Sequence, residues 1–270
     1  MDTRPIGVFD SGLGGLSAVR TLQEILPEED LIYFGDTARV PYGGRSKATL
    51  LDYARQDLRF LERFQPKALL VACGTVSTNC LAELQQENER PIVGVVEPTC
   101  RRAVEESRSG RIGLIATPAS VRSGAYEAEL KRQAPGVTVA SKACPLFVPL
   151  VENGRILPGD VVIETVAREY LEPLRKARVD TLILGCTHYP LLSEIIGGIM
   201  GPEVSLISSG AESAVALKRL LKERDLLAPA GSAGSAAFYV SDRPEDFEQT
   251  ASLFLQAELH GVRRVEIEQY

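Results

Sequence analysis

The chain has 270 residues, 44% of them hydrophobic and 24% charged, which is enough for one large domain or two smaller ones that share a cleft. The formal net charge of −6 argues against nucleic acid and against an anionic membrane surface as partners, because phosphate groups are bound by basic surfaces. No apolar run reaches the roughly 18 residues of a membrane-spanning helix, and no signal peptide is recognisable, so we expect a cytoplasmic protein.

Short apolar runs alternate with amphipathic segments along the chain. The runs are rich in leucine or β-branched residues and are apolar on both alternations, as in strands that are covered on both faces. The expected strands are Ile6–Phe9, Leu31–Phe34, Ala68–Ala72, Ile92–Val95, Ile112–Ala116, Val137–Ser141, Thr181–Leu184, Val204–Ile207 and Ala237–Val240.

Helical spacing separates these strands. The apolar residues between Leu51 and Leu61 recur every three or four positions, with Ser46 near the expected helix start, and those between Val162 and Leu174 recur every four. The Ala-, Gly-, Pro- and Ser-rich stretch Leu226–Ser235 is typical of a loop. Alternating strands and helices predict an α/β fold with mostly parallel sheets.

Two segments occur twice, in the same order and at nearly the same offset. Ile6–Gly12 is similar to Ile112–Pro118, and Leu69–Thr75 is similar to Leu182–His188. This weak repeat predicts two pseudo-symmetric, doubly wound α/β lobes with the active site in the cleft between them. We expect residues 1–95 plus 208–270 in the first lobe, to which the last strand returns, and residues 96–207 in the second.

Polar residues follow four of the expected strands, where open α/β sheets bind their ligands. They are Asp10-Ser11, Cys73-Gly74-Thr75, Thr117 and Cys186-Thr187-His188, and a further group, Pro41-Tyr42-Gly43, lies in a loop. Tyr42 is either a packing aromatic of that loop or a ligand contact.

The glycines at Gly12, Gly14 and Gly15 nearly match a dinucleotide-binding fingerprint, but Asp10 would direct its charge at the pyrophosphate. A carboxylate at this place suits a cationic group such as a substrate ammonium, and glycines let the backbone approach a small ligand. The alternative is that Asp10 only caps the following helix.

Five cysteines without a C-x-x-C pair indicate reduced thiols, and each one alone is most simply a buried packing residue. Cys73 and Cys186 differ from the others because they end matched strands of the repeat. Two thiols facing one cleft suit proton removal on one face of a substrate and delivery on the other. We expect the remaining three, Cys80, Cys100 and Cys144, to be packing residues.

A catalytic thiol needs a nearby base or positive charge, since few free thiols are ionised at pH 7. His188 can serve Cys186 and Asp10 can serve Cys73. His188 could instead be a structural histidine of the surface or the core, although its place directly after Cys-Thr favours a function. Glu152 is either a solvated loop carboxylate or a partner for His188. The other histidine, His260, is expected to be structural and helical, and the histidine and cysteine spacing predicts no metal site.

Five stretches of the sequence resemble the glutamate racemase family and occur in that family's order. They are Val8–Arg20 (VFDSGLGGLSAVR), Tyr33–Ser46 (YFGDTARVPYGGRS), Leu69–Thr75 (LLVACGT), Phe147–Gly154 (FVPLVENG) and Leu182–Leu192 (LILGCTHYPLL).

The resemblance implies interconversion of L- and D-glutamate without pyridoxal phosphate or metal, in a protein that is a homodimer and supplies D-glutamate for peptidoglycan. Cys73 would exchange the α-proton with D-glutamate, assisted by Asp10. Cys186 would exchange it with L-glutamate, assisted by His188 with Glu152 behind it. The resemblance implies that the substrate is bound by Asp10, Ser11, Pro41, Tyr42, Gly43, Gly74, Thr75, Thr117 and Thr187.

One departure from the family concerns Gly74, where the family usually has an asparagine whose amide would help hold the substrate amino group. A water, or Asn79 or Ser77 nearby, could replace that amide. Ser120, where the family commonly has Thr, keeps the hydroxyl. Gly74 leaves open a racemase with another amino-acid preference, or a binding or regulatory protein without catalysis. A Cys-His-Asp hydrolase would give the second cysteine no role.

Overall fold

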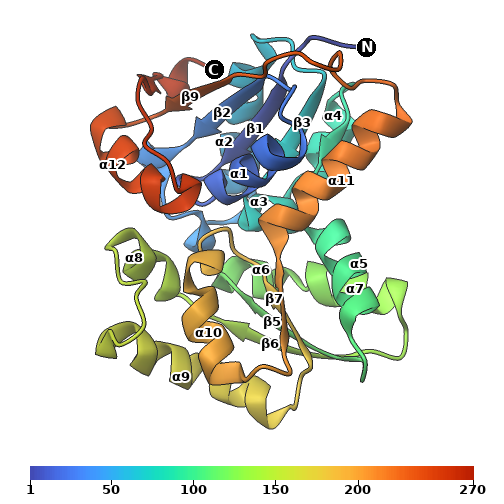
Figure 1. The fold of residues 1–270 in the computed structure, drawn as a ribbon, viewed down its shortest axis with the longest axis vertical. Coiled ribbons are helices and arrows are strands. Elements are labelled where there is room, and N and C mark those ends of the chain that lie inside the picture. The colour runs from blue at the N-terminus through green and yellow to red at the C-terminus, as the bar shows by residue number, and fades with distance from the viewer.

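The computed structural model describes residues 1–270, whose strands form two separate sheets (Figure 1). The strands of the first sheet are β1 (Ile6–Asp10), β2 (Leu31–Gly35), β3 (Ala68–Val71), β4 (Ile92–Val93), β9 (Ala236–Val240) and β10 (Arg263–Arg264). Those of the second are β5 (Arg111–Ala116), β6 (Thr138–Ala143), β7 (Thr181–Leu184) and β8 (Ser205–Ser208). Every pairing in both sheets is parallel, which confirms the predicted fold class.

Helices connect the parallel strands, as this topology requires. They are α1 (Leu16–Ile25), α2 (Lys47–Glu62), α3 (Gly74–Asn79), α4 (Leu81–Glu87), α5 (Val96–Glu106), α6 (Pro118–Ser123), α7 (Ala125–Gln133), α8 (Phe147–Glu152), α9 (Val161–Lys176), α10 (Ser193–Met200), α11 (Ser209–Glu223) and α12 (Pro244–Leu255). No helix combines the length and the apolar character that crossing a membrane would need.

The predicted repeat is visible in the strand order. The first sheet runs β10-β9-β2-β1-β3-β4 and the second β6-β5-β7-β8, so β2-β1-β3-β4 corresponds to β6-β5-β7-β8. The repeated segments therefore occupy equivalent strands, β1 with β5 and β3 with β7. Because β1, β3 and β7 are buried along their whole length, their sequences are apolar on both alternations.

Each predicted strand is present, with small differences at its ends. The largest shortening is in Ile92–Val95, because Val95 already has helical backbone angles and forms the N-cap of α5. Ser46 caps α2 by accepting a hydrogen bond from the Thr49 N–H, as its position suggested. The prediction that His260 is helical is wrong: α12 ends at Leu255, followed by Gln256 with φ of 54°.

The C-terminal segment returns to the first sheet, where β9 pairs with β2 in register from Leu31 with Ala236 to Gly35 with Val240. The division into residues 1–95 plus 208–270 and residues 96–207 stays a prediction. The two helices that follow the crossings between the sheets, α5 and α11, pack against each other, and α11 also packs on α1 (Figure 1).

The two lobes approach each other at backbone distance near Gly74, the first residue of α3. A Cβ atom added to Gly74 would lie 2.5 Å from the carbonyl oxygen of Gly185, in the segment that follows β7. Hydroxyl groups bridge the lobes beside it, with the Oγ1 atoms of Thr75 and Thr117 3.0 Å apart. The glycine at position 74 therefore permits a contact that any side chain would push apart.

Replacing Gly74 by alanine is expected to lower the free energy of unfolding by about 1–3 kcal/mol, because the obstructing atom belongs to backbone and cannot rotate away. Urea denaturation of the wild type and of Gly74→Ala measures this difference in the free energy of unfolding. The matched control is Gly136→Ala, since a Cβ at Gly136 meets no atom within 4 Å. A Gly74→Ala protein as stable as the wild type would contradict the close approach.

Candidate active site

A cavity of about 350 Å³ lies where the carboxyl ends of the two sets of strands meet. Every predicted site residue except Asp10 lines it: Ser11, Pro41, Tyr42, Gly43, Cys73, Gly74, Thr75, Thr117, Glu152, Cys186, Thr187 and His188. The topology explains the gathering, because β1 and β3 are adjacent in one sheet, β5 and β7 are adjacent in the other, and all four end facing the same space.

Asp10 is fully buried at the end of β1, behind the cavity wall. Its carboxylate accepts a hydrogen bond from the Gly12 N–H at 3.0 Å and one from Thr187 Oγ1 at 3.5 Å. The backbone N–H of Gly15, the N-cap residue of α1, also interacts with it, so Asp10 lies at the start of that helix as the capping alternative proposed. Burial raises the pKa of Asp10, while the positive charge of His188 and nearby backbone N–H groups oppose the rise.

Cys73 follows β3 at the N-cap of α3 and is almost completely buried. Its Sγ donates to Ser11 Oγ at 3.6 Å. Burial raises the pKa of the Cys73 thiol to about 12, and the charge of Asp10 adds to the effect. The structure thus favours the protonated, neutral form of Cys73.

Cys186 has a different environment, since it begins a chain of three polar groups. Its Sγ lies 3.8 Å from His188 Nδ1, and His188 Nε2 lies 3.0 Å from Glu152 Oε1 at the end of α8. Glu152 is therefore a partner of His188, and not simply a solvated carboxylate. The ring of Phe254 from α12 packs edge-on against His188, with the ring centroids 5.6 Å apart.

The electrostatics of His188 follow from its neighbours. Burial works against the charged imidazolium, but hydrogen bonds and charges from Cys186 and Glu152 outweigh it and raise the pKa of His188 to about 10. At neutral pH the protonated His188 can donate one N–H toward Cys186 and the other to Glu152, so that it stabilises negative charge on the sulfur.

The neighbours suggested as substitutes for an asparagine amide at position 74 do not reach the cavity. Ser77 Oγ donates to the Val71 carbonyl at 3.0 Å, and Asn79 Nδ2 donates to the Thr75 carbonyl at 2.8 Å, so both groups are engaged in α3 and its approach. The polar atoms next to Gly74 in the cavity are instead the hydroxyls of Thr75 and Thr117, and Ser120 Oγ lies 3.1 Å behind Thr117 Oγ1.

Sequence reasoning missed part of the wall. Val40, Gly44, Pro118, Cys144, Pro145, Val148, Pro149 and Gly185 also line the cavity. Cys144 was expected only to pack; it is buried but reaches this wall, and most of the others carry no reactive group that a motif search would select. No cluster of three or more His, Cys, Asp or Glu side chains is arranged to hold a metal ion.

Comparison with known proteins places this geometry in a family. Residues 14–217 match the model of the Asp/Glu/hydantoin racemase family. The chain is 46% identical to a glutamate racemase from Geobacter metallireducens over 268 residues, which cover 99% of this chain and 98% of that protein.

Solved structures of glutamate racemases have the same fold as this chain. A glutamate racemase isoform, RacE1, from Bacillus anthracis matches with a TM-score of 0.93 at 35% identity, covering 98% of each chain. A glutamate racemase from Francisella tularensis, solved in complex with D-glutamate, matches with a TM-score of 0.92 at 38% identity, covering 100% of each chain. As the resemblance to glutamate racemases implied, the chain belongs to the Asp/Glu/hydantoin racemase family.

Proposed function

We propose that the chain is a glutamate racemase, which interconverts L- and D-glutamate by moving the α-proton between two thiols. The observation that carries this proposal is that Cys73 and Cys186 line one cavity from two lobes, each with its own charged partner. Full-length similarity to glutamate racemases supports glutamate as the substrate over other amino acids.

In this mechanism one sulfur removes the α-proton as a thiolate and the other delivers a proton to the opposite face as a thiol. Cys186 acts first on L-glutamate and Cys73 acts first on D-glutamate. The hydroxyls of Ser11, Thr75, Thr117 and Thr187 bind the carboxylates and the ammonium. The loop residues Pro41 to Gly43 and Gly74 close the cavity around them.

The surroundings of the two sulfurs set their protonation states before substrate binds. Burial and the charge of Asp10 keep the proton on Cys73, whereas protonated His188 lies within hydrogen-bonding distance of Cys186. The free enzyme is therefore arranged to take the proton from L-glutamate first. One turnover to D-glutamate leaves the proton on Cys186 and the thiolate at Cys73, which is the state that accepts D-glutamate.

We further propose that the enzyme works in the cytoplasm, supplies D-glutamate for peptidoglycan and forms a homodimer. Sedimentation velocity is expected to give a mass close to that of two chains at micromolar protein. A single species with the mass of one chain would contradict the dimer and leave the racemase proposal unaffected.

Either enantiomer of glutamate, incubated with the enzyme in D2O, is expected to lose its optical activity and its Cα proton signal in NMR. Cys73→Ser and Cys186→Ser should each lower racemisation by at least about 10²-fold, because each removes one of the two proton-transfer groups. Cys100→Ser is the matched control, since Cys100 is buried outside the cavity and bonds the Tyr126 carbonyl. Folded protein that incorporates no deuterium from either enantiomer would exclude the proposal.

Protonation of His188 predicts a pH dependence of stability. Its pKa in the folded state is raised to about 10 from 6.5, so the folded protein holds a proton that the unfolded chain releases above pH 6.5. The resulting stabilisation is complete below pH 6.5 and is lost as the pH rises to about 10.

Urea denaturation at several pH values should therefore show the free energy of unfolding falling over this range, and falling less steeply in His188→Gln. The control is His260→Gln, because the side chain of His260 is 79% exposed and lies outside the cavity. Equal slopes for wild type and His188→Gln would show that His188 is not protonated as described.

A further inference from the structure

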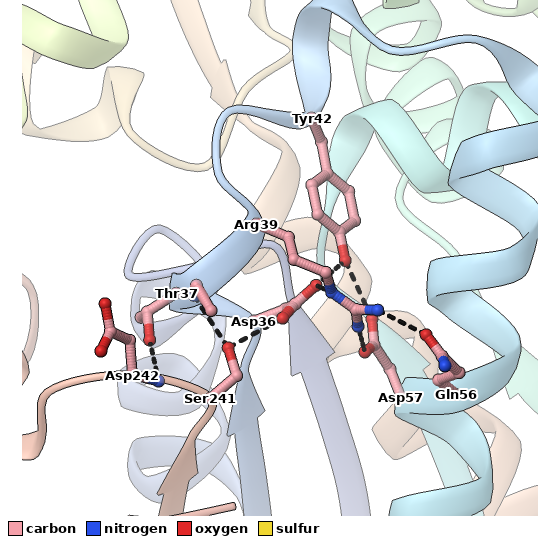
Figure 2. Close-up of polar contacts among 9 residues, drawn as sticks. Asp36, Thr37, Arg39, Tyr42, Gln56, Asp57, Ser241 and Asp242 are labelled. Atoms are coloured by element: carbon pink, nitrogen blue, oxygen red, sulfur yellow. Dashed lines mark hydrogen bonds and ion pairs between the residues drawn. The ribbon is translucent and has the colours of Figure 1, made fainter. Parts of the chain in front are cut away.

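A cluster of buried polar side chains, of which only Tyr42 lines the cavity, holds the loop that carries Pro41, Tyr42 and Gly43 (Figure 2). We call it the loop cluster; its members are Asp36, Arg39, Tyr42, Asp57 and Ser241. Asp36 and Asp57 are fully buried, and Tyr42 and Ser241 nearly so. They come from the end of β2, the loop itself, the buried face of α2 and the end of β9.

Asp36 is the acceptor on which the cluster converges. Its Oδ2 accepts from Arg39 Nε at 2.6 Å and from the Tyr42 hydroxyl, and its Oδ1 accepts from Ser241 Oγ at 2.8 Å. Ser241 Oγ in turn accepts from the Ala38 N–H at 2.9 Å. Oδ2 of Asp36 thus pairs with the positively charged guanidinium of Arg39, and both hydroxyls can donate to the carboxylate, an arrangement that suits its ionised form.

Arg39 connects this carboxylate to α2. Its Nη2 donates to Asp57 Oδ1 at 3.0 Å and its Nη1 donates to Gln56 Oε1. The guanidinium also lies 4.1 Å from the centre of the Tyr53 ring, which adds a cation–π contact.

The single hydrogen of the Tyr42 hydroxyl bears on the protonation state of Asp57. The Tyr42 hydroxyl has one hydrogen, which it donates to Asp36, yet its oxygen also lies 3.3 Å from Asp57 Oδ2. If the Tyr42 hydrogen goes to Asp36, as the shorter of the two contacts favours, a neutral Asp57 carboxylic acid supplies the hydrogen of the second contact. The cluster then holds one anion, one cation and one neutral acid, and no unbalanced buried charge.

Burial and the charges around Asp57 also favour its neutral, protonated form. Burial raises the pKa of Asp57 well above its ordinary value, and the negative charge of Asp36 adds to the rise, while Arg39 and the hydrogen bond with Tyr42 oppose it. The groups that face Asp57 are Asp36, Arg39 and Tyr42, with Asp10 of β1 adding further negative charge.

We propose that the loop cluster positions the substrate-binding loop, with ionised Asp36 and protonated Asp57 holding Tyr42 by its hydroxyl from both sides. Tyr42 is then an anchor whose hydroxyl is not free to bind substrate (Figure 2). Asp36, Arg39 and Asp57 are positioning residues that act through the loop. This inference rests on the proposed racemase function.

The same chemical change at the two aspartates should have opposite results. In Asp57→Asn the amide can donate to the Tyr42 oxygen and accept from Arg39, as the acid does, so KM for both enantiomers should stay within about twofold of wild type. In Asp36→Asn the charge that pairs with Arg39 is lost and one of the two acceptor oxygens becomes a donor, so KM should rise on the order of tenfold with a smaller change in kcat.

Tyr42→Phe removes the held hydroxyl and should raise KM on the order of tenfold as well, which tests the proposal if Asp36→Asn does not fold. The control for lost stability alone is Lys67→Met. It breaks a buried ion pair with Glu29 (2.5 Å, with side chains 0% and 2% exposed) that precedes β3 and β2, away from the cavity. It should lower the melting temperature without raising KM.

Amide hydrogen exchange across residues 40–45, measured without substrate, separates this inference from the racemase proposal. Exchange there should be at least about tenfold faster in Tyr42→Phe and unchanged in Asp57→Asn. A wild type that does not racemise glutamate but shows this exchange pattern would overturn the proposed function alone. A KM increase in Asp57→Asn equal to that in Tyr42→Phe, or unchanged KM and exchange in Tyr42→Phe, would overturn the positioning role.

Discussion

Burial of the charged residues beside the two thiols is the condition on which the chemistry of this site depends. Charge–charge interactions strengthen as the local dielectric falls, so the charges of Asp10 and His188 act strongly on the sulfurs only because both lie buried. The contact of Gly74 with the Gly185 carbonyl brings the lobes close enough for that burial.

The two sheets are pseudo-symmetric in the strands that carry the thiols, but not in the residues beside those thiols. The equivalent strands β3 and β7 deliver one thiol each to the same cavity, as a reaction on two faces of one carbon requires. The neighbours of the thiols are not equivalent, because β1 ends in an aspartate near Cys73 whereas the segment after β7 supplies a histidine to Cys186. The repeated fold places the two thiols in one cavity, and the departures from the repeat give each thiol a different charged neighbour.

Sequence reasoning succeeded where a local pattern decides the structure. Apolar runs located the strands, the repeat anticipated their order, and polar residues at strand ends assembled the cavity wall. Sequence reasoning failed where a contact between residues far apart in the chain decides the structure. The family pattern made Gly74 look like the loss of an amide, but its contact with Gly185 is visible only with both lobes in place.

Tyr42 is a second example, because the direction of its hydroxyl depends on Asp57, which sits on an amphipathic helix among apolar neighbours. An aspartate on such a helix would ordinarily be assigned to the solvent side. Only the meeting of α2 with the end of β2 shows that Asp57 is inside.

Pairing of β9 with β2 has a consequence for the order of events during synthesis. The residues that line the cavity all precede Tyr189, yet Ser241 bonds Asp36 and Phe254 packs on His188. When every cavity residue of a nascent chain has left the ribosome, Ser241 and Phe254 have not yet been synthesised. The cavity residues therefore still lack two of the contacts that hold them in place. Activity should begin only after the last strand and helix have joined the first sheet, so that an unfinished chain carries both thiols without the means to use them.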